Sequence, residues 1–248
     1  MSGPRAALVT GASSGIGLAV ATALRALGHD LTVVARTRDR LTAARDTLAV
    51  GGAHVVAVAA DLAEPDAPGR AVDAHLQAHG RLDVLVHSAG VGLFGALDEQ
   101  GDRRVDLQID LNLRALARLS AHGLRALRKA GAEHGKALVV AVSSLVGVEP
   151  QPDVVPYSMT KPAAARLLPG RHLECARHGV QFTAVCPALV DTPGASWAAD
   201  GDKLPAEDVA QAVRFLLSTS PACFVPEIQL RTAEPFHLPD PSPAKGRA

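Results

Sequence analysis

The sequence predicts an α/β protein in which helices cover both faces of a doubly wound parallel sheet of about seven strands. Short apolar runs alternate with longer stretches of helical period along the 248 residues. Most of these runs are continuously apolar, as expected of parallel strands that helices bury on both sides. Apolar residues make up 48% of the chain but aromatic residues only 3%, so Ala, Val and Leu must build a closely packed helix-on-sheet core.

Each expected strand is a short apolar run, beginning with "AALVT" and "LTVVAR". The strands are expected at 6–10, 31–36, 54–61, 82–88, 137–144, 181–187 and 227–231. The stretches between them have helical period, and the helices are expected at 16–27, 38–49, 67–79, 102–130, 157–177 and 206–218. Right-handed connections between parallel strands then place helices on both faces of the sheet.

Length and composition indicate one domain, residues 1–234, which must contain any binding sites of the protein. The Pro-rich end, 235–248, is expected to be a flexible tail. Basic and acidic residues number 25 each, and the resulting zero net charge predicts no binding to nucleic acid or to a membrane surface. Three widely spaced cysteines and an N-terminus without a signal peptide predict a cytoplasmic protein.

The turn between the first strand and the first helix, "TGASSGIG", indicates a site for a dinucleotide pyrophosphate. Gly11 permits a tight turn, Gly15 allows backbone amides to approach an anion, and Gly17 allows the helix to pack closely on the sheet. The helix N-terminus adds free N–H groups and a partial positive charge. The remaining expected contacts are Ser13, Ser14 and Ile16. The alternative is a simple glycine-rich turn.

The end of the second strand favours NADP(H) over NAD(H). Many NAD sites place a carboxylate there to bind the ribose 2′-hydroxyl. Here Arg36 follows the strand, and no carboxylate occurs before Asp39. An arginine can pair with the 2′-phosphate of NADP in a forked geometry. The alternative is a solvated surface arginine.

Seven motifs in chain order resemble those of the one-domain short-chain dehydrogenases/reductases, from about residue 5 to about residue 231. They are "TGASSGIG" (10–17), "DL" (61–62), "HSAG" (87–90), "LNL" (111–113), "VVAVSS" (139–144), "YSMTK" (157–161) and "CPALVDTP" (186–193). The resemblance implies a Rossmann-like fold. It also implies further cofactor contacts from Asp61, Leu62, Ser88, Ala89, Gly90, Pro187, Val190 and Thr192.

The chain's only tyrosine, Tyr157, and Lys161 lie four residues apart, which places them on one face of a helix. A phenol is a weak acid at neutral pH unless a positive charge stabilises its phenolate. The resemblance makes Tyr157 the acid-base residue and Lys161 its partner and a ligand of the nicotinamide ribose. Ser144, 13 residues before the tyrosine, would bind the substrate oxygen, with Ser143 as its competitor.

The only asparagine, Asn112, would anchor a water that links Lys161 to solvent, although a lone helix asparagine can also be a plain surface residue. The segment 192–205 corresponds to a short substrate lid, in which Trp197 either contacts substrate or covers the lid's own backbone. The ten histidines are expected on helix surfaces and form no close metal-binding pattern, so no metal is predicted.

These observations predict an NADP(H)-dependent oxidoreductase that moves hydride between the nicotinamide and a small-molecule carbonyl or secondary alcohol. Its relatives pair the tyrosine helix with a second copy, so a homodimer or homotetramer is expected. Pro162 and Pro169 interrupt the pattern of that helix and predict kinks or a break after Lys161. A broken helix supports the alternative of a catalytically silent nucleotide-binding regulatory or scaffold protein.

Overall fold

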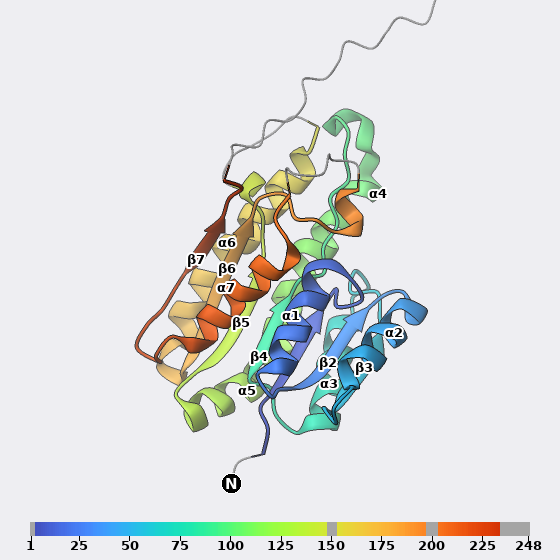
Figure 1. Ribbon diagram of the computed structural model, residues 1–248. Helices are drawn as coiled ribbons and strands as arrows, with labels where there is room; N and C mark the ends of the chain where they lie inside the picture. The colour runs from blue at the N-terminus through green and yellow to red at the C-terminus, as the bar shows by residue number, and fades with distance from the viewer. Residues whose placement is uncertain (1–2, 148–152, 197–202, 234–248) are drawn as a thin grey trace, which may run out of the picture.

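The computed structural model describes residues 3–147, 153–196 and 203–233, and Figure 1 shows their arrangement. Seven strands form one sheet in the order β3-β2-β1-β4-β5-β6-β7, and every neighbouring pair is parallel. The strands are β1 (Ala6–Thr10), β2 (Asp30–Ala35), β3 (Val55–Ala59), β4 (Val84–His87), β5 (Ala137–Val142), β6 (Val180–Pro187) and β7 (Glu227–Leu230). This confirms the doubly wound sheet, with strand bounds that differ from the expected ones by a few residues.

Helices cover both faces of the sheet (Figure 1). They are α1 (Gly15–Ala26), α2 (Arg38–Ala49), α3 (Ala67–His79), α4 (Leu97–Ile109), α5 (Ala115–His134), α6 (Val155–Cys175) and α7 (Ala206–Ser218). One core cluster joins the sheet to α1, α2 and α7, and the other joins it to α3, α5 and α6. Strand order reverses between β1 and β4, so the crevice at their carboxyl ends is where ligands bind in such sheets.

The single helix expected at 102–130 is divided among three segments, namely the end of α4, a π-helical turn and most of α5. Gly101, with φ 63° and ψ 155°, kinks α4. A π-helical turn, Asp110–Arg114, then separates α4 from α5. Such turns inside α-helices are rare and often mark functional sites. This one holds Asn112.

The break expected in the tyrosine helix does not occur, because α6 runs from Val155 to Cys175 through Pro162 and Pro169. Each proline removes one backbone hydrogen bond. Ala164, Leu168 and Cys175 are buried in the core on the same helix. We attribute the continuity to this packing, since tertiary contacts often override helix propensity.

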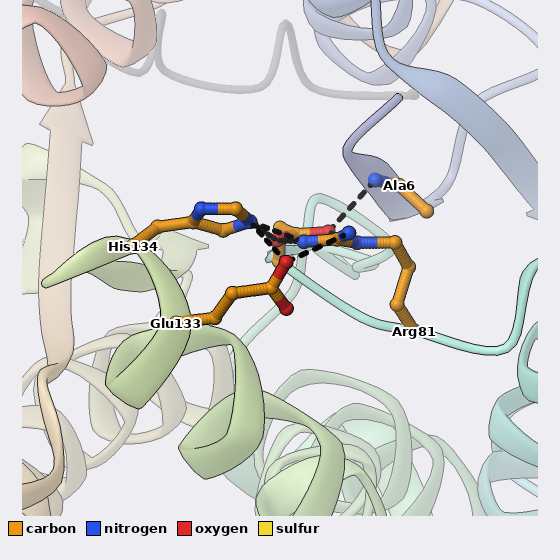
Figure 2. Close-up of polar contacts among 5 residues, drawn as sticks. Ala6, Arg81, Glu133 and His134 are labelled. Carbon is orange, nitrogen blue, oxygen red and sulfur yellow. Dashed lines mark hydrogen bonds and ion pairs between the residues drawn. The ribbon is translucent and has the colours of Figure 1, made fainter. Parts of the chain in front are cut away.

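A polar network holds the amino edge of the sheet together (Figure 2). The carboxylate of Asp83, only 2% exposed, accepts hydrogen bonds from the Ala6 N–H at 2.9 Å and from two Arg81 nitrogens at 2.7 Å. Glu133 and His134 complete the cluster. Burial favours the protonated form of Asp83, but the hydrogen bonds from Arg81 and Ala6 outweigh it and lower the pKa of the carboxyl. The network therefore fixes the start of β1 with a charged group.

Two expectations lie outside the described residues, namely the position of Trp197 and the flexibility of 235–248. None of the described helices has the length and apolar character that a membrane span requires.

Candidate active site

The glycine turn after β1 contacts two other loops at the carboxyl edge of the sheet. Gly11 has φ 66°, and a β-carbon there would lie 2.9 Å from the Ala89 nitrogen. Gly15 has φ 51°, and a β-carbon there would lie 2.8 Å from the Thr192 side chain. A β-carbon on Gly17 would lie 2.3 Å from the Gly11 carbonyl oxygen. Only glycine fits at these positions, so the structure brings these predicted cofactor contacts together.

The N-terminus of α1 has no side-chain cap. Ser14 precedes the helix in an extended conformation, and its side chain makes no capping hydrogen bond. The first-turn amides of a helix have no intrahelical partner, and they attract negative charge. Ser13, Ser14 and Ile16 are partly buried around this turn. The turn therefore fits the pyrophosphate of a dinucleotide.

The strands beyond this turn place the other predicted nucleotide contacts along the same edge. Arg36 directly follows β2 and is exposed. Asp61 comes two residues after β3, and its Oδ1 accepts the Ala63 N–H at 3.1 Å. The Leu62 side chain is buried in the core, so only its backbone is available to a ligand.

Thr10 and His87, which sequence reasoning missed, fix the loop that carries Ser88 and Ala89. The Thr10 hydroxyl oxygen accepts the N–H groups of Ser88 at 3.2 Å and Ala89 at 3.1 Å. His87 joins this hydroxyl through Nδ1 and the Leu111 carbonyl through Nε2, both at 3.2 Å. The carbonyl can only accept, so Nε2 carries the proton and the Thr10 hydroxyl donates to Nδ1.

Burial, together with the charge of Lys161, lowers the pKa of His87 to about 3 against the opposing hydrogen bond to Leu111, so the ring is neutral. The expectation that histidines lie on helix surfaces is wrong for His29, His75 and His87, which are all buried. His87 ends β4 immediately before the Ser88–Gly90 stretch. This place, directly before a predicted cofactor-binding stretch, is the sequence signal that could have identified His87 as a site residue.

Asn112 is buried, so the alternative of a surface residue is wrong. Its Oδ1 accepts the Val91 N–H at 2.8 Å, and its Nδ2 donates to the Val91 carbonyl at 2.9 Å and to the Thr160 hydroxyl at 3.0 Å. The side chain thus joins the π-helical turn to the loop after β4 and to α6.

Tyr157 and Lys161 occupy one turn of α6, as the spacing predicts. The Lys161 Nζ donates to the Val142 carbonyl at 2.9 Å and lies 5.4 Å from the centroid of the Tyr157 ring. A β-carbon on Gly90 would lie 3.3 Å from that Nζ and 3.0 Å from the Asn112 Oδ1, and one on Gly92 would lie 3.4 Å from the Tyr157 ring. The loop after β4 therefore packs against Lys161, Asn112 and Tyr157.

The two serines after β5 have different surroundings. The Ser143 hydroxyl is buried and donates to the Lys161 carbonyl at 2.8 Å, which ties α6 to the sheet. Ser144 is only partly buried, and its Oγ accepts the Val146 N–H at 3.3 Å. These surroundings leave Ser144 as the serine available to a substrate.

The segment after β6 lies beside the glycine turn. Pro187 ends the strand, and Val190, 5% exposed, forms a parallel bridge with Leu204. The bridge holds the base of the expected lid in place. The Thr192 side chain then lies against Gly15, where an added β-carbon would be 2.8 Å from it.

Comparison with known proteins agrees with this geometry. Residues 5–202 match the family described as short chain dehydrogenase. An uncharacterised oxidoreductase of Staphylococcus epidermidis is 30% identical over 92% of this chain and 96% of its own. A putative ketoacyl reductase of the granaticin polyketide synthase of Streptomyces violaceoruber is 35% identical over 75% of this chain and 68% of its own.

Solved structures give the same result. An alcohol dehydrogenase of the archaeon Thermococcus sibiricus, complexed with 5-hydroxy-NADP, superposes with a TM-score of 0.85 at 29% identity, covering 95% of this chain and 100% of its own. A variant of actinorhodin polyketide ketoreductase with NADPH has a TM-score of 0.83 at 28% identity, covering 93% of this chain and 97% of its own. The chain is therefore a member of the short-chain dehydrogenase family.

Proposed function

We propose that this protein is an NADP(H)-dependent oxidoreductase that transfers hydride reversibly between the nicotinamide and a carbonyl or secondary alcohol. The observation that carries the proposal is the contact of one loop with three predicted catalytic groups. Gly90 approaches Lys161 and Asn112 so closely that a β-carbon would not fit freely, and a β-carbon on Gly92 would be in van der Waals contact with the Tyr157 ring. Side chains with separate structural roles would not need this convergence.

In the direction of reduction, Tyr157 donates a proton to the substrate oxygen. NADPH held by the glycine turn and Arg36 would supply the hydride for the carbonyl carbon. The Lys161 ammonium, 5.4 Å from the ring centroid, stabilises the negative charge that the phenol gains. Ser144 holds the substrate oxygen by a hydrogen bond. Asn112 fixes the loop and α6 relative to each other, and we assign proton exchange with solvent to its π-helical turn.

The assignment of NADP(H) rests on Arg36. This exposed arginine follows β2, and the next carboxylate after it in the sequence is Asp39, in α2. A 2′-phosphate would gain a charge-assisted hydrogen bond there, worth about 1.5–3 kcal/mol. The Thermococcus sibiricus and actinorhodin proteins, which were solved with NADP-type cofactors, support the same choice.

The alternative of a catalytically silent nucleotide-binding protein loses its main support because α6 is continuous. We also propose that the enzyme is cytoplasmic and assembles as a homodimer or homotetramer. Light scattering that shows a monomer at micromolar concentration would contradict the assembly.

The decisive experiment is an NADPH-oxidation assay over a panel of aliphatic, aromatic and polyketide-like ketones, run with the wild type and with Tyr157→Phe. We expect turnover by the wild type and a loss of about 10²–10⁴-fold in kcat for the variant, because general acid-base catalysis supplies about that factor. NADPH affinity should change little. Binding of NADPH without turnover of any ketone in the panel would favour the silent alternative.

The cofactor choice is tested separately with Arg36→Asp. The ratio of kcat/KM for NADPH over NADH should fall by about ten- to a hundredfold, since about 1.4 kcal/mol corresponds to each factor of ten. Arg38→Asp, two residues further along in α2, is the matched control and should have the smaller effect. An unchanged ratio in Arg36→Asp would contradict the role of Arg36.

A further inference from the structure

Three potential metal ligands meet at the amino edge of the sheet, the edge opposite the candidate active site. Asp30 is the first residue of β2, His54 directly precedes β3, and His79 is the last residue of α3. One ligand atom from each lies within 4.8 Å of the other two. Because these residues are widely spaced in the sequence, no local motif reveals the cluster.

The cluster lies in the wall of a hollow of about 360 Å³, between the ends of β2, α3 and α5. The backbone N–H of His54 donates to Asp30 Oδ1 at 3.2 Å, which holds this carboxylate beside β3. The His54 side chain is exposed and its ring lies edge-on to that of His79, with 4.8 Å between centroids. The hollow leaves room for water at a further coordination position.

Hydrogen bonds orient His79. Its Nε2 lies 3.1 Å from the Thr32 hydroxyl, and the Nδ1 of buried His75 lies 2.8 Å from the same oxygen. This hydroxyl has one proton, so it donates to one ring and accepts from the other. If Thr32 donates to His75, His79 donates through Nε2 and has its lone pair on Nδ1. That Nδ1 is buried and has no hydrogen-bond partner among the described residues.

The contact with Thr32 suits His79 to ligation, because it leaves the unpartnered Nδ1 as the free ring nitrogen. A metal-bound histidine usually donates its other ring N–H to a neighbouring group, which is the arrangement that Thr32 provides.

Arg81 and Lys129 are the described arginine and lysine side chains that line the hollow. Arg81 is paired with Asp83 and with Glu133, and the Glu133 carboxylate lies 3.6 Å from the Arg81 guanidinium (Figure 2). Lys129 is exposed, so solvent screens its charge. The carboxylate of Asp30 adds a negative charge among the ligands. Two imidazoles and one carboxylate form a donor set typical of zinc.

We propose that Asp30, His54 and His79 bind one Zn²⁺ ion, with water in the remaining position, and that the ion ties the amino ends of β2 and β3 to the end of α3. Ligand atoms bound to one tetrahedral zinc ion at about 2.0–2.2 Å lie about 3.3–3.6 Å apart. Ligand atoms that are up to 4.8 Å apart must therefore approach one another by about 1 Å on binding, and the exposed His54 ring is the ligand most free to move. The ion stabilises the fold and is remote from the proposed hydride transfer.

The test uses untagged, chelator-treated protein titrated with ZnCl₂ by calorimetry and followed by thermal unfolding. We expect one Zn²⁺ per chain and a rise in Tm of about 5–10 °C at a hundredfold excess over Kd. His54→Gln, an exposed substitution that should not impair folding, removes both effects. His122→Gln changes another exposed histidine, on α5, and should keep both.

A second readout is the visible absorption of the Co²⁺-loaded protein, which should show a nitrogen-ligated site in the wild type and in His122→Gln but not in His54→Gln. Stoichiometric binding that survives His54→Gln, or no binding at micromolar Zn²⁺, overturns the proposal. Turnover with NADPH should be the same with and without zinc, so the two proposals fail independently.

Discussion

At the carboxyl edge of the sheet, polar side chains hold one another so that Tyr157 and Ser144 stay partly accessible. At the amino edge, Asp83 is buried and its polar partners hold the ends of strands. Both edges contain charged groups with little exposure, Lys161 at one and Asp83 at the other. The difference lies in the neighbours of the buried charge, since Lys161 has the partly accessible Tyr157 beside it, whereas Asp83 bonds Arg81 and the Ala6 N–H. A buried charge therefore indicates acid-base chemistry only where an accessible proton donor stands beside it.

The largest expected effect on stability is at the amino edge. Asp83→Ala should lower the free energy of unfolding by about 3 kcal/mol, because it leaves the Ala6 N–H without its partner and Arg81 without its two shortest carboxylate contacts. Urea denaturation measures the loss. Glu133→Gln, a change at a more exposed position of the same network, should cost under about 1 kcal/mol. Equal losses for the two variants would show that burial does not set the cost.

The two serines after β5 sharpen the comparison within the carboxyl edge. Ser144→Ala should lower kcat/KM by about a hundredfold, as expected when one hydrogen bond to a reacting oxygen is lost, and leave stability nearly unchanged. Ser143→Ala should instead lower stability by about 1 kcal/mol, because its hydroxyl bonds the Lys161 carbonyl. Steady-state kinetics and urea denaturation on both variants separate these outcomes. The reverse pattern would exchange the roles of the serines.

Acid should destabilise the protein through His75 and His87. Their folded-state pKa of about 3 lies below the ordinary value of 6.5, so their contribution to stability is complete above pH 6.5 and declines as the pH falls toward 3. At pH 5 each should have lost about 2 kcal/mol. The urea midpoint measured from pH 7 to pH 5 should fall, and less steeply in His75→Asn or His87→Asn. A midpoint that is constant over this range would contradict the burial of neutral rings.

A small effect on stability alone is expected at Lys136, just before β5. Its ammonium donates to the Leu216 and Thr219 carbonyls at the end of α7. Lys136→Met should cost about 1 kcal/mol in unfolding free energy without changing kcat. Lys129→Met, on α5, serves as the control for loss of a lysine charge. A change in kcat for Lys136→Met would show that the two edges are coupled.

The sequence by itself determined the strand and helix order, the glycine turn, the spacing of Tyr157 and Lys161, and the arginine after β2. These features depend on local periodicity or on residues near one another in the chain. The parallel sheet then brings its carboxyl ends to one edge, so motifs in register predict a single site.

Only the tertiary structure decided the continuity of α6, the role of His87 and the meeting of Asp30, His54 and His79. Buried Leu168 and Cys175 accompany the two prolines of α6, and this packing is not visible in helix propensity. His87 and His75 are buried because of the elements around them, which local patterns do not describe. Contacts between residues distant in the chain exist only once the sheet has formed, and they set burial, hydrogen bonding and charge at these positions.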